Sequence, residues 1–211
     1  MLTETFSLFN DTNLTDSFNG FIDTIHEITL SDNPQDVTLY LGSLGSGGGD
    51  TEDRQLQAQS NPGVDNMAIS IINILPEWNN DTNYIVGDCI EPVTPNGFRY
   101  RCIIAGTSHL TTEPVWSGMG GIGSIIVDNT VTWKKVSARH PVTEVTLALN
   151  SGDLGTNTPG NPLNIGNTIV SGTINALPIY VRIVNTVTTV STNTVTPEIG
   201  LSLNSSVERE V

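Results

Sequence analysis

The chain has 211 residues, enough for one domain of ordinary size together with a small inserted one. Its 8 Lys and Arg stand against 22 Asp and Glu, and a net charge of -14 argues against binding to nucleic acid or to an anionic membrane surface. Residues 1–20 lack the basic start and apolar run of a signal peptide, and no stretch reaches the ~20 apolar residues of a membrane-spanning helix. We therefore expect a soluble protein made in a cytosol.

The first twenty residues form a polar segment that carries three phenylalanines, Phe6, Phe9 and Phe18. Two interpretations stay open for it. In the first, residues 1–20 are an edge strand or a short helix that covers the main domain. In the second, they are an N-terminal arm whose phenylalanines make assembly contacts by filling a pocket on an adjacent subunit.

Most of the chain has the composition of β-strands, because Val, Ile and Thr are abundant and Gly, Pro, Asn and Asp recur about every ten residues. Val145, Leu147 and Leu149 share one face of a strand, the pattern of a sheet buried on one side. We predict an all-β fold in which residues 21–77 and 137–211 form a jelly-roll-like β-sandwich. The predicted strands are residues 21–30, 36–43, 66–75, 143–150, 167–172, 177–186 and 198–204.

A Gly-rich loop is predicted between the second and third of these strands. Residues 43–66, SLGSGGGDTEDRQLQAQSNPGVDN, combine a Gly cluster with acids and amides. Such a segment buries too little apolar surface to offset the entropy of ordering it. We expect it to become ordered against neighbouring subunits, as a contact segment of an assembly.

The composition changes between residues 78 and 136, where all three tryptophans of the chain lie. Five acids and four bases give this span a charge of -1, which leaves -13 for the rest of the chain. We predict an inserted all-β module here. So small a unit has little room for an aliphatic core, and Trp78, Tyr84 and Trp133 are expected to form a miniature aromatic core, which Trp116 either joins or leaves for a role at the surface.

The module also contains both cysteines, Cys89 and Cys102. A hairpin turn centred on Pro95 and Asn96 would place them opposite each other, whereas a turn at Asn96 and Gly97 would not. Two cysteines are too few for a disulfide scaffold and are not spaced as a zinc site. A reducing site of synthesis favours two buried free thiols.

Many aromatic and glycine positions of the module follow one spaced pattern. It reads W-x5-Y-x2-G-D, then F-x-Y-x-C-x3-G-T-S, then E-P-x-W, and finally D-x-T-V-x-W. The pattern resembles a small all-β module found repeatedly in structural proteins of tailed bacteriophages, and it is distantly similar to chitin-binding-type carbohydrate-binding modules. Members of this family usually have Gly at the position of Asn129, and the turn there is expected to differ slightly.

The resemblance implies a non-enzymatic structural protein of a tailed-phage particle. We expect a capsid decoration or cement protein on the outer surface of the head, found in the virion and assembled in the cytoplasm of the bacterial host. Its partners would be the major capsid protein or other virion proteins, and further copies of the chain in a homo-oligomer such as a trimer.

The alternative is a neck, tail, baseplate or fibre component that contacts host polysaccharide through the module. In similar modules of chitinases a flat aromatic surface stacks on sugar rings. The residues in this sequence that would provide such a glycan-binding surface are Tyr100, Trp116 and the neighbouring Glu113.

The sequence contains no motif for catalysis, for a cofactor or for a metal. His26, His109 and His140 lie far apart and lack the spacing of metal ligands. The glycines of residues 118–124 lack the lysine of a phosphate-binding loop, and no serine lies in a nucleophile elbow. We expect neither enzymatic activity nor a bound cofactor or metal.

Overall fold

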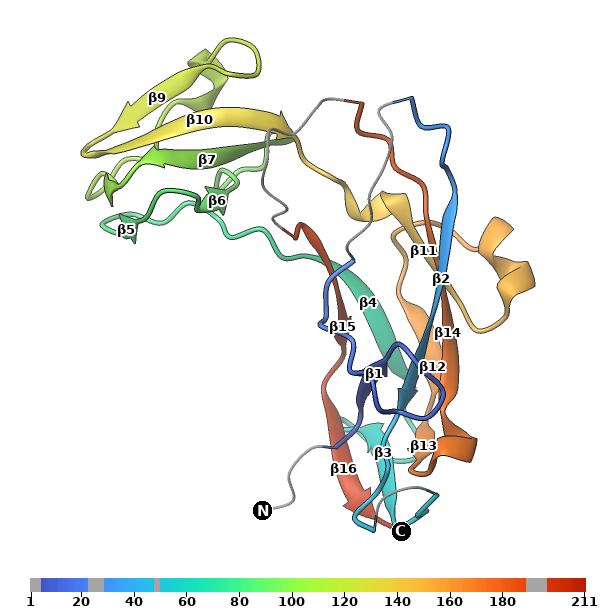
Figure 1. Ribbon diagram of the computed structural model, residues 1–211. Helices are drawn as coiled ribbons and strands as arrows, with labels where there is room; N and C mark the ends of the chain where they lie inside the picture. Colours follow the sequence, from blue (N-terminus) through green and yellow to red (C-terminus); the bar gives the residue numbers. More distant parts are fainter. Residues whose placement is uncertain (1–4, 23–28, 48–49, 189–196) are drawn as a thin grey trace.

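The structure is a computed structural model (Figure 1), and it describes residues 5–22, 29–47, 50–188 and 197–211. The protein is all-β, which confirms the predicted fold class: among the described residues the named strands pair antiparallel, and the helical elements are short 3-10 turns. In this part of the chain no helix is long and apolar enough to cross a membrane.

One layer of the main domain is a four-stranded sheet in the order β1-β2-β14-β11. Its central strands β2 and β14 pair over the whole of β14, from Leu41 opposite Leu177 to Gln35 opposite Ile183. The edge strands are short. The bounds of the four strands are β1 (Ser7–Phe9), β2 (Gln35–Gly42), β11 (Val145–Ala148) and β14 (Leu177–Ile183).

The opposite layer consists of two three-stranded sheets, in the orders β12-β4-β15 and β13-β3-β16. Only Asn167 separates β12 from β13, and only two residues separate β15 from β16. The second sheet therefore continues the first. The break follows Gly166, whose φ of 87° favours glycine. The bounds are β3 (Arg54–Ala58), β4 (Met67–Asn73), β12 (Leu163–Gly166), β13 (Thr168–Val170), β15 (Ile199–Leu203) and β16 (Ser206–Glu210).

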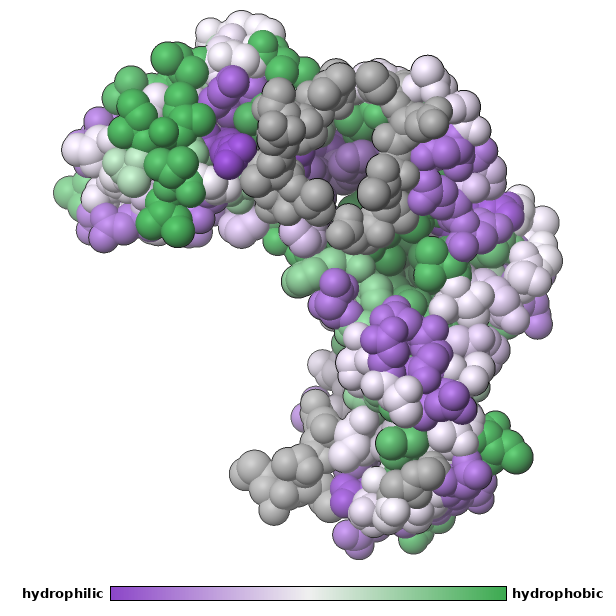
Figure 2. All heavy atoms as spheres, viewed as in Figure 1, coloured by the Kyte–Doolittle hydropathy of each residue, from purple (hydrophilic) through white to green (hydrophobic). Residues whose placement is uncertain are grey.

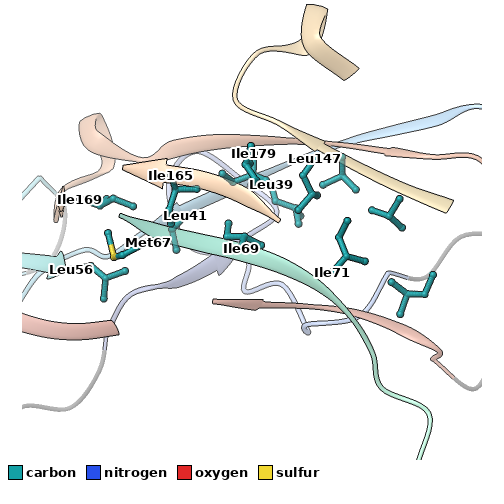
Figure 3. Close-up of a cluster of buried hydrophobic side chains, with 14 of the residues drawn as sticks. Leu39, Leu41, Leu56, Met67, Ile69, Ile71, Leu147, Ile165, Ile169 and Ile179 are labelled. Carbon is teal, nitrogen blue, oxygen red and sulfur yellow. The ribbon is translucent and has the colours of Figure 1, made fainter. Parts of the chain in front are cut away.

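An aliphatic core fills the space between the two layers (Figure 3). Alternation along β4 turns Met67, Ile69 and Ile71 inward, toward the apolar residues of β2 and β14. The architecture is therefore β-sandwich-like, whereas the jelly-roll order of strands stays a prediction. The core residues are Leu39, Leu41, Leu56, Ala58, Met67, Ile69, Ile71, Val145, Leu147, Leu163, Ile165, Ile169, Ile179, Val181, Ile183 and Ile199.

Six predicted strands overlap observed ones, namely β2, β4, β11, β13, β14 and β15. The predicted strand at residues 21–30 lies mostly outside the described residues, and Phe21 forms an isolated bridge to Gly200. The short strands β12 and β16 were not predicted, because LNIG is only four residues long and SVERE offers few apolar residues.

The prediction of a Gly-rich loop over residues 43–66 is wrong for its second half. Residues Arg54–Ala58 form β3, the central strand between β13 and β16. Leu56 and Ala58 are buried in the core of the sandwich, and Arg54 pairs with Glu208 at 3.0 Å. This part of the segment is therefore ordered by its own chain, without a neighbouring subunit.

The described part of the N-terminal segment is an edge of the sandwich. Strand β1 pairs with β2, Phe9 is buried, and Phe6 and Phe18 pack against the aliphatic core. The described residues therefore favour the first interpretation, an edge strand that covers the main domain, and assembly contacts of Phe6, Phe9 and Phe18 stay a prediction.

Candidate functional site

The module has a four-stranded sheet of its own, in the order β6-β7-β10-β9, and a two-stranded sheet formed by β5 and β8. Figure 1 shows it projecting from one end of the sandwich. The strands are β5 (Asn83–Tyr84), β6 (Cys89–Ile90), β7 (Phe98–Ile104), β8 (Gly106–Thr107), β9 (Ile125–Asp128) and β10 (Val131–Ala138).

Aromatic rings dominate the core of the module. The rings of Tyr84 and Trp133 meet edge to face with centroids 4.7 Å apart, and those of Tyr100 and Trp116 lie 4.3 Å apart. Burial raises the pKa of both tyrosines, because a phenolate loses its hydration there. Trp78, Tyr84 and Trp133, the residues predicted to form a miniature core, all lie in this cluster.

The predicted glycan-binding surface of Tyr100, Trp116 and Glu113 is corrected by the burial of its rings. Tyr100 is 0% exposed and Trp116 only 6% exposed. Glu113 accepts hydrogen bonds from Nε1 of Trp116 at 2.7 Å and from the backbone N–H of Val93 at 2.9 Å. A ring without an exposed face cannot stack on a sugar, and these residues serve the interior of the module.

One buried carboxylate connects three parts of the module. Asp128 is 4% exposed, and its Oδ2 accepts hydrogen bonds from Nε1 of Trp78 at 2.8 Å and of Trp133 at 3.3 Å. Its Oδ1 accepts the backbone N–H of His109 at 2.8 Å. Buried indole N–H groups need an acceptor, and Asp128 supplies one to both. The sequence analysis missed this role, although Asp128 opens the D-x-T-V-x-W part of the pattern.

The backbone explains which residues stand at two further positions of the module. A Cβ atom on Gly106 would lie 2.4 Å from the carbonyl carbon of Thr130, which leaves room only for glycine. Asn129 has a φ of 55°, a left-handed conformation that Gly adopts freely and Asn tolerates. Asn129 therefore requires no turn different from one that glycine would form.

The two cysteines are buried free thiols in the structure. Cys89 lies opposite Arg101 and Ile90 opposite Tyr100, and neither of the two turns considered for this hairpin accounts for the register. The reason is that residues 91–97 form a longer connection than a two-residue turn. Burial raises the pKa of the Cys102 thiol, and the nearby carboxylate of Asp88 adds to this effect.

Buried ion pairs join the module to the sandwich. Arg99 of β7 lies 2.7 Å from Glu198, and the side chains are 6% and 4% exposed. Glu91, at the edge of the module, pairs with Arg139 and accepts a hydrogen bond from Asn73 of β4. Breaking such a buried pair is costly because it leaves a charge without a partner, and these contacts therefore fix the module in one orientation.

A histidine and a carboxylate lie beside this junction. His140 Nδ1 is 2.7 Å from Glu144, which also accepts the backbone N–H of Thr186 at 2.6 Å. Burial alone would lower the pKa of His140, but the hydrogen bond and charge of Glu144 raise it overall. Burial opposes ionisation of Glu144, but hydrogen bonds from His140 and Thr186 lower its pKa overall.

His109 takes no part in a metal site within the described part of the chain. His109 accepts backbone N–H groups of Thr111 and Thr112 through Nδ1, and His26 lies outside the described residues. Where the chain is described, no group of three or more His, Cys, Asp and Glu is placed to hold a metal ion. A groove of about 250 Å³ beside β2 is lined by residues such as Phe18 and Val37, without an acid or base for catalysis.

The outer face of the module sheet is apolar and cationic. Val127, Thr132 and Ile104 lie side by side on β9, β10 and β7, and Ile125, Lys134 and Arg101 form the next row. Figure 2 shows hydrophobic residues gathered over the region of β9. Ile104, Ile125 and Val127 are 56%, 61% and 66% exposed. Thr132, on the central strand, is only 6% exposed. We define the other five residues, Arg101, Ile104, Ile125, Val127 and Lys134, as the outer face.

This face is the best candidate for a functional surface, because scattered apolar residues are common on proteins but contiguous ones mark contact sites. Sequence reasoning missed it, since a run such as IIVD in β9 suggests a buried strand as readily as an exposed one. Comparison of the chain with protein-family models, with characterised proteins and with solved structures gave no match.

Proposed function

We propose that the chain is a non-enzymatic structural protein of a tailed-phage particle, and that it decorates the outer surface of the head. The observation that carries the proposal is what the residues of the phage-like pattern do in the structure. Its rings, Gly106 and Asp128 build a closed core, and the residues left at the surface form a sheet face suited to contact with other proteins.

The way the module is held supports the same proposal. A decoration protein gains affinity by presenting a preformed surface, because little conformational freedom is then lost on binding. The buried pair of Arg99 and Glu198 and the contacts of Glu91 hold the projecting module in place. The sandwich supplies the larger aliphatic body from which the module projects.

Antibody labelling of tailed-phage particles tests the proposal. Antibodies raised against the purified chain are applied to tailed-phage particles from the source culture, and the bound label is located by electron microscopy. We expect label over the heads and a stained-gel band that indicates many copies per particle. Label confined to the neck, tail or baseplate, with few copies, would favour the alternative role there. Particles without the chain would contradict both.

A further inference from the structure

We propose that the outer face of the module docks on the far end of the sandwich of a second copy of the chain, and so joins copies head to tail. The inference goes beyond a role in phage particles, because it names an interface that the chain forms with itself. It rests on two surfaces at opposite ends of the molecule that match in charge and in apolar content.

The first surface is the outer face. Arg101 and Lys134 are direct neighbours on β7 and β10, and among the described residues neither forms an ion pair. Next to them lie the exposed Ile104, Ile125 and Val127. Together these residues form an apolar patch with two positive charges at its side, a combination suited to an apolar knob surrounded by carboxylates.

The second surface has an exposed apolar residue with carboxylates beside it. At the far end of the sandwich, Ile174 is 80% exposed. The residues on either side of Ile174 donate hydrogen bonds to two acids. Asp50 accepts one from Thr173, and Glu52 accepts one from Asn175 at 2.8 Å.

Further side chains extend this far end. Val211 is 73% exposed, and its backbone N–H donates to the carbonyl oxygen of Asp53 at 3.0 Å. Glu210 and Arg209 are exposed as well, and the acids outnumber the one exposed arginine. The far end therefore presents exposed apolar side chains surrounded mainly by negatively charged ones.

Charge complementarity favours this pairing over others. Two outer faces would bring four cations together, which disfavours a symmetric contact between modules. A polyanion such as nucleic acid would be repelled by the net charge of -14 of the whole chain. Figure 1 places η4 (Thr173–Asn175) and the start of β3 at the end of the sandwich opposite the module, and the contact therefore requires a second copy. Head-to-tail contacts of this kind close into rings or continue as filaments.

Two charge-reversal variants test the interface on the purified full-length chain. R101E/K134E changes only the outer face, and D50K/E52K changes only the far end. By sedimentation at low ionic strength we expect the natural chain to form species larger than a monomer, increasingly so with concentration. At an ionic strength of about 1 M, where charges are screened within ~3 Å, it should shift toward the monomer.

Each variant alone is expected to stay monomeric, since one of its two surfaces is blocked. An equimolar mixture should associate again, because the intact outer face of one variant binds the intact far end of the other, and the two reversed surfaces also have opposite charges. The matched control D16K/D65K reverses two exposed carboxylates elsewhere and should associate like the natural chain. If R101E/K134E fails to fold, Ile125→Thr with Val127→Thr replaces it in the same mixture.

The proposal is overturned if the natural chain is monomeric at every concentration, or if the mixture of variants does not pair. It is also overturned if D50K/E52K alone associates like the natural chain, because the contact would then not use the far end. None of these results depends on binding to a phage particle, and failure of this interface is therefore distinguishable from failure of the proposed role.

Discussion

The sandwich and the module are both antiparallel β structures, yet different chemistry holds each together. The buried core of the sandwich consists of aliphatic side chains and one methionine, whereas five of the eight residues in the core of the module are Trp or Tyr. A small unit gains more buried area per residue from rings, but each indole brings an N–H that needs an acceptor. The buried carboxylate of Asp128 is the consequence. A cluster of aromatic residues in a small β module is therefore poor evidence for a ligand site.

The largest expected effect comes from removing a ring from the module. Trp133→Ala should cost about 4 kcal/mol, since it empties the centre of the aromatic core, and the module should unfold while the sandwich persists. All three tryptophans lie in the module, and tryptophan fluorescence therefore reports on it alone, while circular dichroism reports on both regions. Ile125→Ala, at an exposed position, is the control and should change stability by less than about 0.5 kcal/mol. Unchanged fluorescence and dichroism transitions in Trp133→Ala would contradict this.

The second prediction concerns the contact between the two regions. Arg99→Met leaves the carboxylate of Glu198 buried without its ion-pair partner and should cost about 3 kcal/mol. We expect the fluorescence transition of the module to separate from that of the sandwich in a urea titration. Adding Glu198→Gln removes the buried charge and should restore much of the loss. If Arg99→Met unfolds in one transition at the natural urea midpoint, the ion pair does not couple the regions.

A smaller effect is expected when the acceptor inside the module is altered. Asp128→Asn keeps the shape of the side chain but replaces one acceptor oxygen by an amino group, which cannot accept from an indole. We expect a loss of about 2 kcal/mol that is confined to the fluorescence transition. Asp81→Asn, at an exposed position of the module, is the matched control. Equal midpoints for the two variants would show that Asp128 is not essential to the aromatic core.

Much of the fold was predictable because its central strands alternate clearly. Met67, Ile69 and Ile71 of β4 point to one face, as the period of a strand requires. Strand β16 gives no such signal, since the side chain that it buries is Glu208, and only the structure shows Arg54 beside it. In the sequence, a charged residue is expected at the surface, and its burial is recognised only when its ion-pair partner is known.

The site was harder to predict, because composition does not tell in which direction a ring points. The sequence indicated that Tyr100 and Trp116 belong to the module, but their burial depends on strands that are distant in sequence. The role of Asp128 depends on three segments that meet only in the folded chain. The outer face requires the register of β7, β9 and β10, which no single strand reveals.

The smallest predicted effect is a pH dependence beside the junction of the two regions. The raised pKa of His140 means that its contribution to stability is full below its ordinary value of 6.5 and is lost as the pH rises through the folded value. The lowered pKa of Glu144 means that its contribution is present above its ordinary value of 4.5 and is lost as the pH falls through the folded value. The pair should therefore stabilise the protein most between these two ordinary values.

The measurement is the difference in the free energy of unfolding between the natural chain and His140→Asn, followed by urea titration from acid to alkaline pH. The charge of Glu198 also favours the protonated histidine and that of Arg99 opposes it, and the side chain of His140 is 34% exposed. We therefore expect a difference below about 1 kcal/mol that shrinks above pH 6.5. A difference that grows as the pH rises would mean that His140 is neutral in the folded chain. The junction would then depend on the ion pairs of Arg99 and Arg139 alone, and its strength would not change across neutral pH.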